Sequence, residues 1–163
     1  MRRAVVFYSL SGNTESAARM IADDIGADLI QIKMKKELPR SKWLRIVVGG
    51  RQATFGEKPQ IEDLQLSDYD EIILGTPVWA GKVASPLNTL FARYRIADRV
   101  TAVFTLSGSG DNRKCEEMLR RILPNLKQVI SLADGNSRMA EENEEKIRAF
   151  EQTICLTVPP KGV

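Results

Sequence analysis

The sequence predicts an α/β fold with an open five-stranded parallel sheet and helices on both faces. Five short runs rich in β-branched or aromatic residues alternate with segments of helical periodicity. This alternation is typical of parallel strands joined by right-handed crossovers. Three of the runs are apolar at both alternating positions, as expected for strands that are covered on both faces. The length of 163 residues fits one domain, residues 1–163, at about 100–200 residues per domain.

The predicted strands are short, and the segments between them are long enough to form a helix. We expect them at Ala4–Ser9, Asp28–Met34, Glu71–Thr76, Thr101–Ser107 and Gln128–Ala133. The three runs that are apolar on both faces contain VVFY, IILG and AVFTL. Because such runs need cover on both sides, they are expected inside the sheet.

The intervening segments carry apolar residues at helical spacing. After the first strand, such residues recur at i, i+3, i+4 and i+7, and Gly26 offers a stop: Ala18, Ile21, Ala22 and Ile25. Further helices are expected after Ser85-Pro86, over Cys115–Ile122, and from about Met139 to before Pro159-Pro160. The segment Ser41–Gly50 gives a mixed signal, because its apolar spacing suits a helix while Ile46-Val47-Val48 favours a strand.

Composition narrows the chemistry that the chain can perform. There is no histidine, which removes His-based triads, most zinc sites and the commonest general base. Cys115 and Cys155 lack metal-ligand spacing and fall on or beside an apolar helical stripe, so we expect both to be inert. Any chemistry must come from a bound cofactor, from carboxylates or thiols, or be absent.

The net charge of +3 is unevenly distributed, since Lys33–Lys58 contains eight basic and two acidic residues. A solvated basic loop is the simplest interpretation, and without interleaved aromatic residues we expect no nucleic-acid partner. The same segment is a candidate docking surface for redox partner proteins with acidic surfaces. No apolar run approaches the ~20 residues of a membrane span, so we expect a cytoplasmic protein. We also expect a monomer or weak dimer.

Ligands of open parallel sheets bind beyond the carboxyl ends of the strands, and the first such loop is rich in donors. It contains Ser9, Leu10, Ser11, Gly12, Asn13 and Thr14. Backbone amides at a helix N-terminus, joined by hydroxyls, form an anion site. An ordinary helix N-cap needs only one Ser, Thr or Asn side chain, whereas this loop contains several. Neither the Walker pattern with its lysine nor GxGxxG is present, which favours a monophosphate bound through neutral donors.

Two further strand ends are candidates for the same pocket. The third strand is followed by a tryptophan between small residues, in the run Thr76, Pro77, Val78, Trp79, Ala80 and Gly81. The indole ring is suited either to stacking on a planar ligand or to plugging a helix end. The fourth strand leads into a donor-rich loop of Ser107, Gly108, Ser109, Gly110 and Asp111. Placed at one edge of the sheet, these loops would form two further walls of the pocket.

These motifs resemble those of the flavodoxin family. The run FYSLSGNTESAARMIA is similar to the flavodoxin signature, an aromatic-rich strand followed by S/T-x-S/T-G-x-T. GTPVWAG resembles the second flavodoxin loop, and TLSGSGDN resembles the third, which usually ends in G-x-G-D. The resemblance covers nearly the whole chain and implies a short-chain flavodoxin, or flavodoxin-like protein, with FMN as its cofactor.

The resemblance also implies a role for each loop. The FMN phosphate would be held by the first loop, through Ser9, Ser11, Asn13, Thr14 and the amides of Leu10 and Gly12. The inner face of the flavin ring would meet Thr76, Val78 and Trp79, and its N5 edge the backbone of residues 75–81. The pyrimidine edge would meet Ser107, Gly108, Gly110 and Asp111.

One departure from the family pattern bears on function. Many flavodoxins have a tyrosine three residues after the G-x-G-D aspartate, where this chain has Lys114. A lysine charge near the ring would favour the anionic reduced flavin and raise its potential. The family implies a low-potential electron-transfer carrier, while an uncovered outer face would also suit an FMN-dependent NAD(P)H or quinone-type reductase. The cofactor carries the chemistry in both cases.

Overall fold

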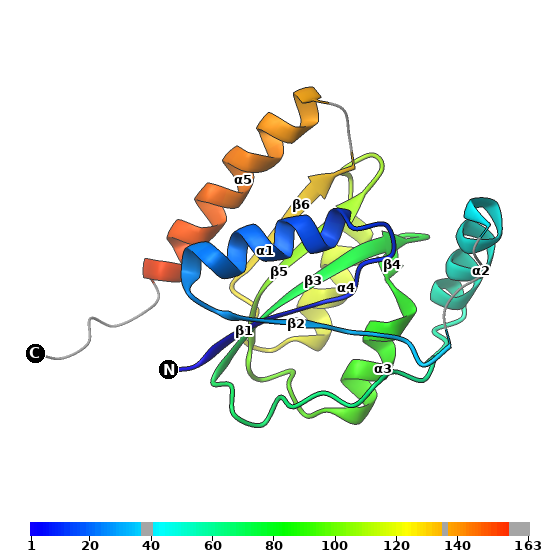
Figure 1. Ribbon diagram of the computed structural model, residues 1–163, viewed down its shortest axis with the longest axis horizontal. Coiled ribbons are helices and arrows are strands. Elements are labelled where there is room, and N and C mark those ends of the chain that lie inside the picture. The colour runs from blue at the N-terminus through cyan, green and yellow to red at the C-terminus, as the bar shows by residue number, and fades with distance from the viewer. Residues whose placement is uncertain (37–40, 135–136, 157–163) are drawn as a thin grey trace, which may run out of the picture.

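The computed structural model describes residues 1–36, 41–134 and 137–156, and its strands form one mostly parallel sheet (Figure 1). The strand order is β2-β1-β3-β5-β6. The five parallel strands are β1 (Arg3–Phe7), β2 (Asp28–Gln31), β3 (Glu71–Trp79), β5 (Val100–Ser107) and β6 (Gln128–Ala133). The expected five-stranded parallel sheet is confirmed, with one addition. A two-residue strand, β4 (Lys82–Val83), pairs antiparallel with the end of β3.

Helices cover both faces of the sheet. On one face lie α1 (Asn13–Ile25) and α5 (Ser137–Leu156), and on the other lie α3 (Ser85–Arg93) and α4 (Arg113–Ile122). A further helix, α2 (Lys42–Thr54), stands near the end of β3 and apart from both layers (Figure 1). The segment Ser41–Gly50, whose sequence pattern suits either a helix or a strand, lies almost entirely in this helix.

Alternating strand residues enter the two cores. Val5 and Phe7 of β1 pack against α1 and α5, whereas Ala4 and Val6 pack toward α3 and α4. In β3, Ile73 faces the first core and its neighbours face the second. Burial on both faces explains the continuous apolar runs in the sequence.

Several element boundaries differ from the sequence prediction, among them those of β1, which spans Arg3–Phe7 instead of Ala4–Ser9. β2 ends at Gln31, after which Met34 forms an isolated antiparallel bridge with Ile61. β3 continues to Trp79, because Val78 and Trp79 pair with β4 in a hairpin. α5 begins two residues before the expected Met139, and the predicted stop at Pro159-Pro160 lies outside the described residues.

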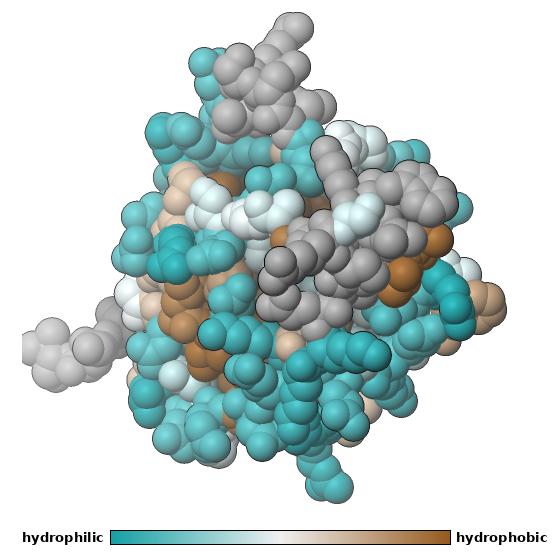
Figure 2. Space-filling view, turned by 45° about the vertical axis from the view of Figure 1, so that its right-hand side comes forward, coloured by the Kyte–Doolittle hydropathy of each residue, from teal (hydrophilic) through white to brown (hydrophobic). Residues whose placement is uncertain are grey.

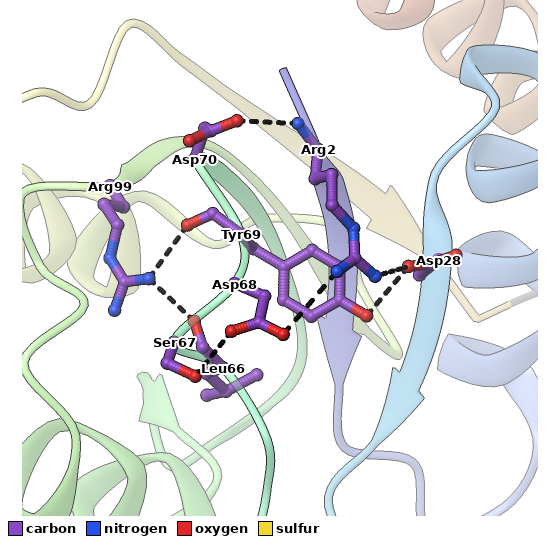
Figure 3. Close-up of polar contacts among 8 residues, drawn as sticks. All are labelled: Arg2, Asp28, Leu66, Ser67, Asp68, Tyr69, Asp70 and Arg99. Atoms are coloured by element: carbon purple, nitrogen blue, oxygen red, sulfur yellow. Dashed lines mark hydrogen bonds and ion pairs between the residues drawn. The ribbon is translucent and has the colours of Figure 1, made fainter.

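A polar network closes the amino ends of the strands, opposite the candidate ligand edge (Figure 3). The Arg2 guanidinium lies 4.9 Å from the centre of the Tyr69 ring and donates to Asp28 Oδ2 at 3.1 Å. The Tyr69 hydroxyl donates to the same oxygen at 2.8 Å, and the Arg2 amide donates to Asp70 at 2.7 Å. The Tyr69 hydroxyl, followed by Arg2, lowers the pKa of Asp28. These contacts join β1 and β2 to the segment that leads into β3.

The packing of α5 against α1 brings together two carboxyl groups, Glu151 and Asp24. Glu151 is only 7% exposed. Burial, and then the neighbouring Asp24, raises the pKa of Glu151 from 4.5 to about 7, while Arg148 acts in the opposite direction. The folded protein therefore holds this proton more tightly than the unfolded chain does.

This raised pKa predicts a pH-dependent stability. The contribution of Glu151 is fully present below its unfolded pKa of 4.5 and is lost as the pH rises through about 7. In the wild type, the free energy of unfolding should fall by an amount on the order of 2 kcal/mol between about pH 5 and pH 7. The Glu151→Gln variant should not show this fall. Urea unfolding of both proteins at several pH values measures this. An equally steep pH dependence in the Gln variant would contradict the assignment.

Candidate functional site

A cavity of about 270 Å³ lies where the three loops meet at the carboxyl edge of the sheet. Residues from all three predicted loops line it, together with two that the sequence analysis missed. The lining consists of Leu10, Ser11, Asn13, Thr14, Pro77, Val78, Trp79, Leu106, Ser107, Gly108 and Asp134. The structure thus brings together segments that are far apart in the sequence.

The first loop presents the start of α1 to this cavity. Gly12 has φ 95°, and its amide donates to the Ser9 hydroxyl oxygen at 3.1 Å. The Gly12 carbonyl accepts from the Ser16 amide at 2.9 Å, which begins the helix. No side chain of the described residues caps α1, and Thr14 is 2% exposed. The first-turn amides can therefore contribute to an anion site.

The predicted second loop is a β-hairpin rather than a loop, which corrects the sequence prediction. Its turn is formed by Ala80 and Gly81, at φ 49° and 75°, and neither residue lines the cavity. The Thr76 hydroxyl is buried, donates to the Pro77 carbonyl at 2.9 Å and accepts from the Ala84 amide at 3.2 Å. Thr76 thus stabilises the hairpin, and Pro77 to Trp79 form the wall.

Trp79 is held between two neighbours while it lines the cavity. Its ring makes an edge-to-face contact with Tyr8, with the ring centres 5.7 Å apart and the planes at 88°. A Cβ atom on Gly49 of α2 would lie 3.3 Å from two ring carbons, so the helix backbone approaches the indole closely. Lys82 also ties the hairpin to α2, donating to the Thr54 carbonyl at 2.9 Å. These contacts give the indole a supported position in the cavity wall.

The third loop is organised by its own side chains. The Ser107 hydroxyl accepts from the Gly110 amide at 3.0 Å, and Ser109 accepts from the Asp111 amide at 3.3 Å. Arg113 pairs with Asp111 at 3.0 Å and lowers its pKa. Ser107 and Gly108 line the cavity, whereas Ser109, Gly110 and Asp111 shape the loop outside the lining.

Lys114 lies beside the hairpin turn. Its aliphatic carbons would be 3.6 and 3.7 Å from a Cβ atom on Gly81. Both residues border a second cavity of about 400 Å³, whose other lining residues are Asp111, Asn112, Arg113 and Glu117. The position where many flavodoxins have a tyrosine therefore adjoins a polar cavity.

Asp134 and Leu106 are the cavity residues that the sequence analysis missed. Asp134 directly follows β6, and its amide donates to the Ser107 carbonyl at 2.7 Å. Its carboxylate accepts from the Asn13 side chain at 2.9 Å. The rule that ligands gather at strand ends also applies to the last strand, and would have drawn attention to Asp134.

The two cysteines, both expected to be inert, differ in exposure. Cys115 is buried, and desolvation, followed by Glu116, raises the pKa of its thiol to about 12. Cys155 is exposed, because its helix turns this residue away from the buried stripe of Ile147, Phe150 and Ile154.

This contrast predicts selective alkylation of the native protein. Iodoacetamide at pH 8 is expected to modify Cys155 and leave Cys115 unmodified, because the thiolate is the reactive form. Peptide mass mapping before and after denaturation measures both sites. Cys115 should react once urea unfolds the chain. Equal labelling of the two cysteines in the native protein would contradict the burial of Cys115.

The described residues contain no cluster of three or more His, Cys, Asp or Glu side chains that could hold a metal. Among the described helices, none combines the length and apolar character that crossing a bilayer requires.

The fold and the cavity define a class of protein, a doubly wound α/β protein with its ligand cavity at the carboxyl edge of the sheet. A first loop rich in hydroxyl and amide groups, an aromatic wall and a donor-rich third loop surround this cavity. The family model described as Flavodoxin matches residues 2–151, and the chain belongs to this family. Family membership agrees with the FMN cofactor expected from the three loops.

Solved structures share the fold. A protein from Bacteroides eggerthii has 21% identity and a TM-score of 0.73, over 94% of this chain and 98% of that one. A flavoprotein from Lactobacillus acidophilus, solved in complex with FMN, has 24% identity and a TM-score of 0.62, over 86% and 97%. An NAD(P)H:quinone oxidoreductase from Methanothermobacter marburgensis has 13% identity and a TM-score of 0.53, over 100% and 99%.

Proposed function

We propose that this protein binds FMN in the three-loop cavity and acts as a low-potential electron-transfer carrier. The observation that carries the proposal is the combination of uncapped helix amides, Trp79 and the third loop around one cavity. Structural relatives include a flavoprotein in complex with FMN.

The residues present fit the two ends of FMN. The amides at the start of α1, with Ser11 and Thr14, suit a phosphate group. Trp79 offers an aromatic surface for the flavin ring, and the backbone of Ser107 and Gly108 offers polar groups for its edge. When bound, FMN would supply the capacity to accept and donate electrons, while the protein binds and orients the ring.

A reductase is the second candidate, favoured by the cavity beside Lys114. This cavity of about 400 Å³ adjoins the hairpin and is bordered by Lys114, by Glu117 and by the Asp111–Arg113 ion pair, so it offers polar groups for a substrate beside the flavin. One structural relative is an NAD(P)H:quinone oxidoreductase. The lining residues of the three-loop cavity do not distinguish the two functions, because the cofactor would carry the chemistry in either case.

An anaerobic reductive titration of the FMN-reconstituted protein tests the proposal. For a carrier, we expect dithionite to bleach the flavin in resolved one-electron steps and NAD(P)H alone to have no rapid effect. Rapid bleaching by NAD(P)H would replace the carrier with the reductase. Failure to bind FMN would reject both functions.

We further propose that the basic segment docks redox partners with acidic surfaces. Lys35 and Lys36 are exposed, as is Phe55, which is 75% exposed after α2. The face in Figure 2 is mostly hydrophilic, with separate apolar areas. The cytoplasmic location, the absence of a nucleic-acid partner, and the monomeric or weakly dimeric state stay predictions.

Charge reversal measures the contribution of this segment. Lys35→Glu with Lys36→Glu is expected to slow association with an acidic redox protein by roughly tenfold at low salt, with a smaller effect at high salt. Stopped-flow electron transfer against ionic strength gives the rate constants. The neutral pair Lys35→Gln with Lys36→Gln should have an intermediate effect. Rates unchanged in both variants would exclude this docking surface.

A further inference from the structure

The lining of the three-loop cavity includes a carboxylate, although a site for a phosphate group is not expected to contain a negative charge. Among the described residues that line it, Asp134 is the only charged residue. Asp134 also lines a neighbouring cavity of about 300 Å³ between α1 and α5, together with Asn13. Its carboxylate is therefore close to the first turn of α1.

Asp134 is held in this place by two hydrogen bonds. Its backbone amide donates to the Ser107 carbonyl at 2.7 Å, which fixes it beside the third loop. Its Oδ1 accepts from Asn13 Nδ2 at 2.9 Å, which fixes it beside the first loop. The Asn13 side-chain amide is one of the neutral donors expected for the phosphate, and in this structure it donates to the Asp134 carboxylate instead.

Four other carboxylates around this end of the sheet have cationic partners. The pairs lie on α1, on α5 and at the start of α4, and they are Glu15–Arg19, Glu144–Arg148, Glu142–Lys146 and Asp111–Arg113. No such ion pair involves Asp134 within the described part of the chain. Its negative charge is thus not neutralised by a neighbouring described side chain.

We propose that Asp134 determines how strongly this flavin site recognises the phosphate group. Its carboxylate would repel the phosphate dianion, and it engages the Asn13 side chain, which could otherwise donate to the phosphate. The inference rests on the proposed FMN binding and concerns the balance between FMN and riboflavin, which lacks the phosphate. Two negative charges close together weaken binding, while helix amides favour it. A phosphate monoester loses its second proton near pH 6, so the repulsion increases between about pH 6 and pH 8.

Two substitutions separate charge from hydrogen bonding. Asp134→Asn removes the charge and keeps an oxygen that can accept from Asn13, whereas Asp134→Ala also releases the Asn13 amide. We expect Asp134→Asn to bind FMN about tenfold more tightly at pH 8 and to bind riboflavin as the wild type does. In the wild type, FMN affinity should be higher at pH 6 than at pH 8, and Asp134→Asn should reduce this difference. Asp134→Ala should bind FMN at least as tightly as the Asn variant.

The experiment measures dissociation constants of FMN and riboflavin by quenching of flavin fluorescence, at pH 6 and pH 8 and at low salt. Asp98→Asn is the matched control, because Asp98 is exposed before β5, at the opposite end of the sheet. It should leave both constants unchanged. Circular dichroism and the melting temperature confirm that each variant is folded.

The outcomes are distinguishable. An unchanged ratio of FMN to riboflavin affinity in Asp134→Asn would overturn the inference and leave the proposed function in place. Equal weakening of both flavins would also overturn it, since Asp134 would then support the loop or the ribityl chain. Failure of the wild type to bind either flavin would overturn the proposed function and the inference together.

Discussion

Replacing Gly75 with alanine is expected to destabilise the protein by about 3 kcal/mol or more, because its Cβ atom would overlap a buried ring. The new atom would lie 2.2 Å from Phe104 Cζ and 2.6 Å from Cε2. Phe104 is fully buried and pairs in register with Gly75 across β3 and β5. The ring therefore has little room to move without disturbing the core between the sheet and α1.

Urea unfolding of the glycine variants measures this effect. Gly50→Ala is the matched control, because a Cβ atom there meets nothing within 4 Å and the residue lies inside α2. It should raise stability by about 0.5–1 kcal/mol through helix propensity. If Gly75→Ala fails to fold, the double variant with Phe104→Leu should recover folded protein. A wild-type unfolding midpoint for Gly75→Ala would contradict the predicted overlap.

Trp79→Ala is expected to weaken FMN binding by about 10- to 100-fold, since stacking of an aromatic residue on a flat heterocycle contributes about 1–3 kcal/mol. The indole lines the cavity while Tyr8 and Gly49 support it from other sides. Trp79→Phe should retain much of the affinity, because it keeps a flat aromatic surface. Riboflavin should be weakened to the same extent as FMN, because both have the same ring.

Fluorescence titration with both flavins gives the dissociation constants. Phe55→Ala is the matched control, as it removes an exposed aromatic ring from outside the cavity lining and should leave the constants unchanged. A wild-type FMN affinity in Trp79→Ala would exclude Trp79 as a wall of the flavin site. Weakening of FMN alone would indicate an effect on the phosphate loop instead.

The sequence by itself was sufficient for the fold class, the five parallel strands and the first and third loops. These features depend on local patterns. Apolar residues at both alternating positions mark strands such as β1 and β3 as covered on both faces. Helical spacing likewise predicted the buried residues Ala18 and Ile21 of α1. The donor-rich run from Ser9 to Thr14 was recognisable because its residues are contiguous.

Only the tertiary structure decided how these parts meet. Asn13 and Asp134 are 121 positions apart, and their hydrogen bond exists because β1 and β6 end at the same edge of the sheet. Trp79 lies in a strand rather than in a loop, because Lys82 and Val83 fold back and pair antiparallel with Val78 and Trp79. Gly75 must lack a side chain because Phe104, on a neighbouring strand, occupies that space. Such constraints arise from contacts between distant segments, which local periodicity does not encode.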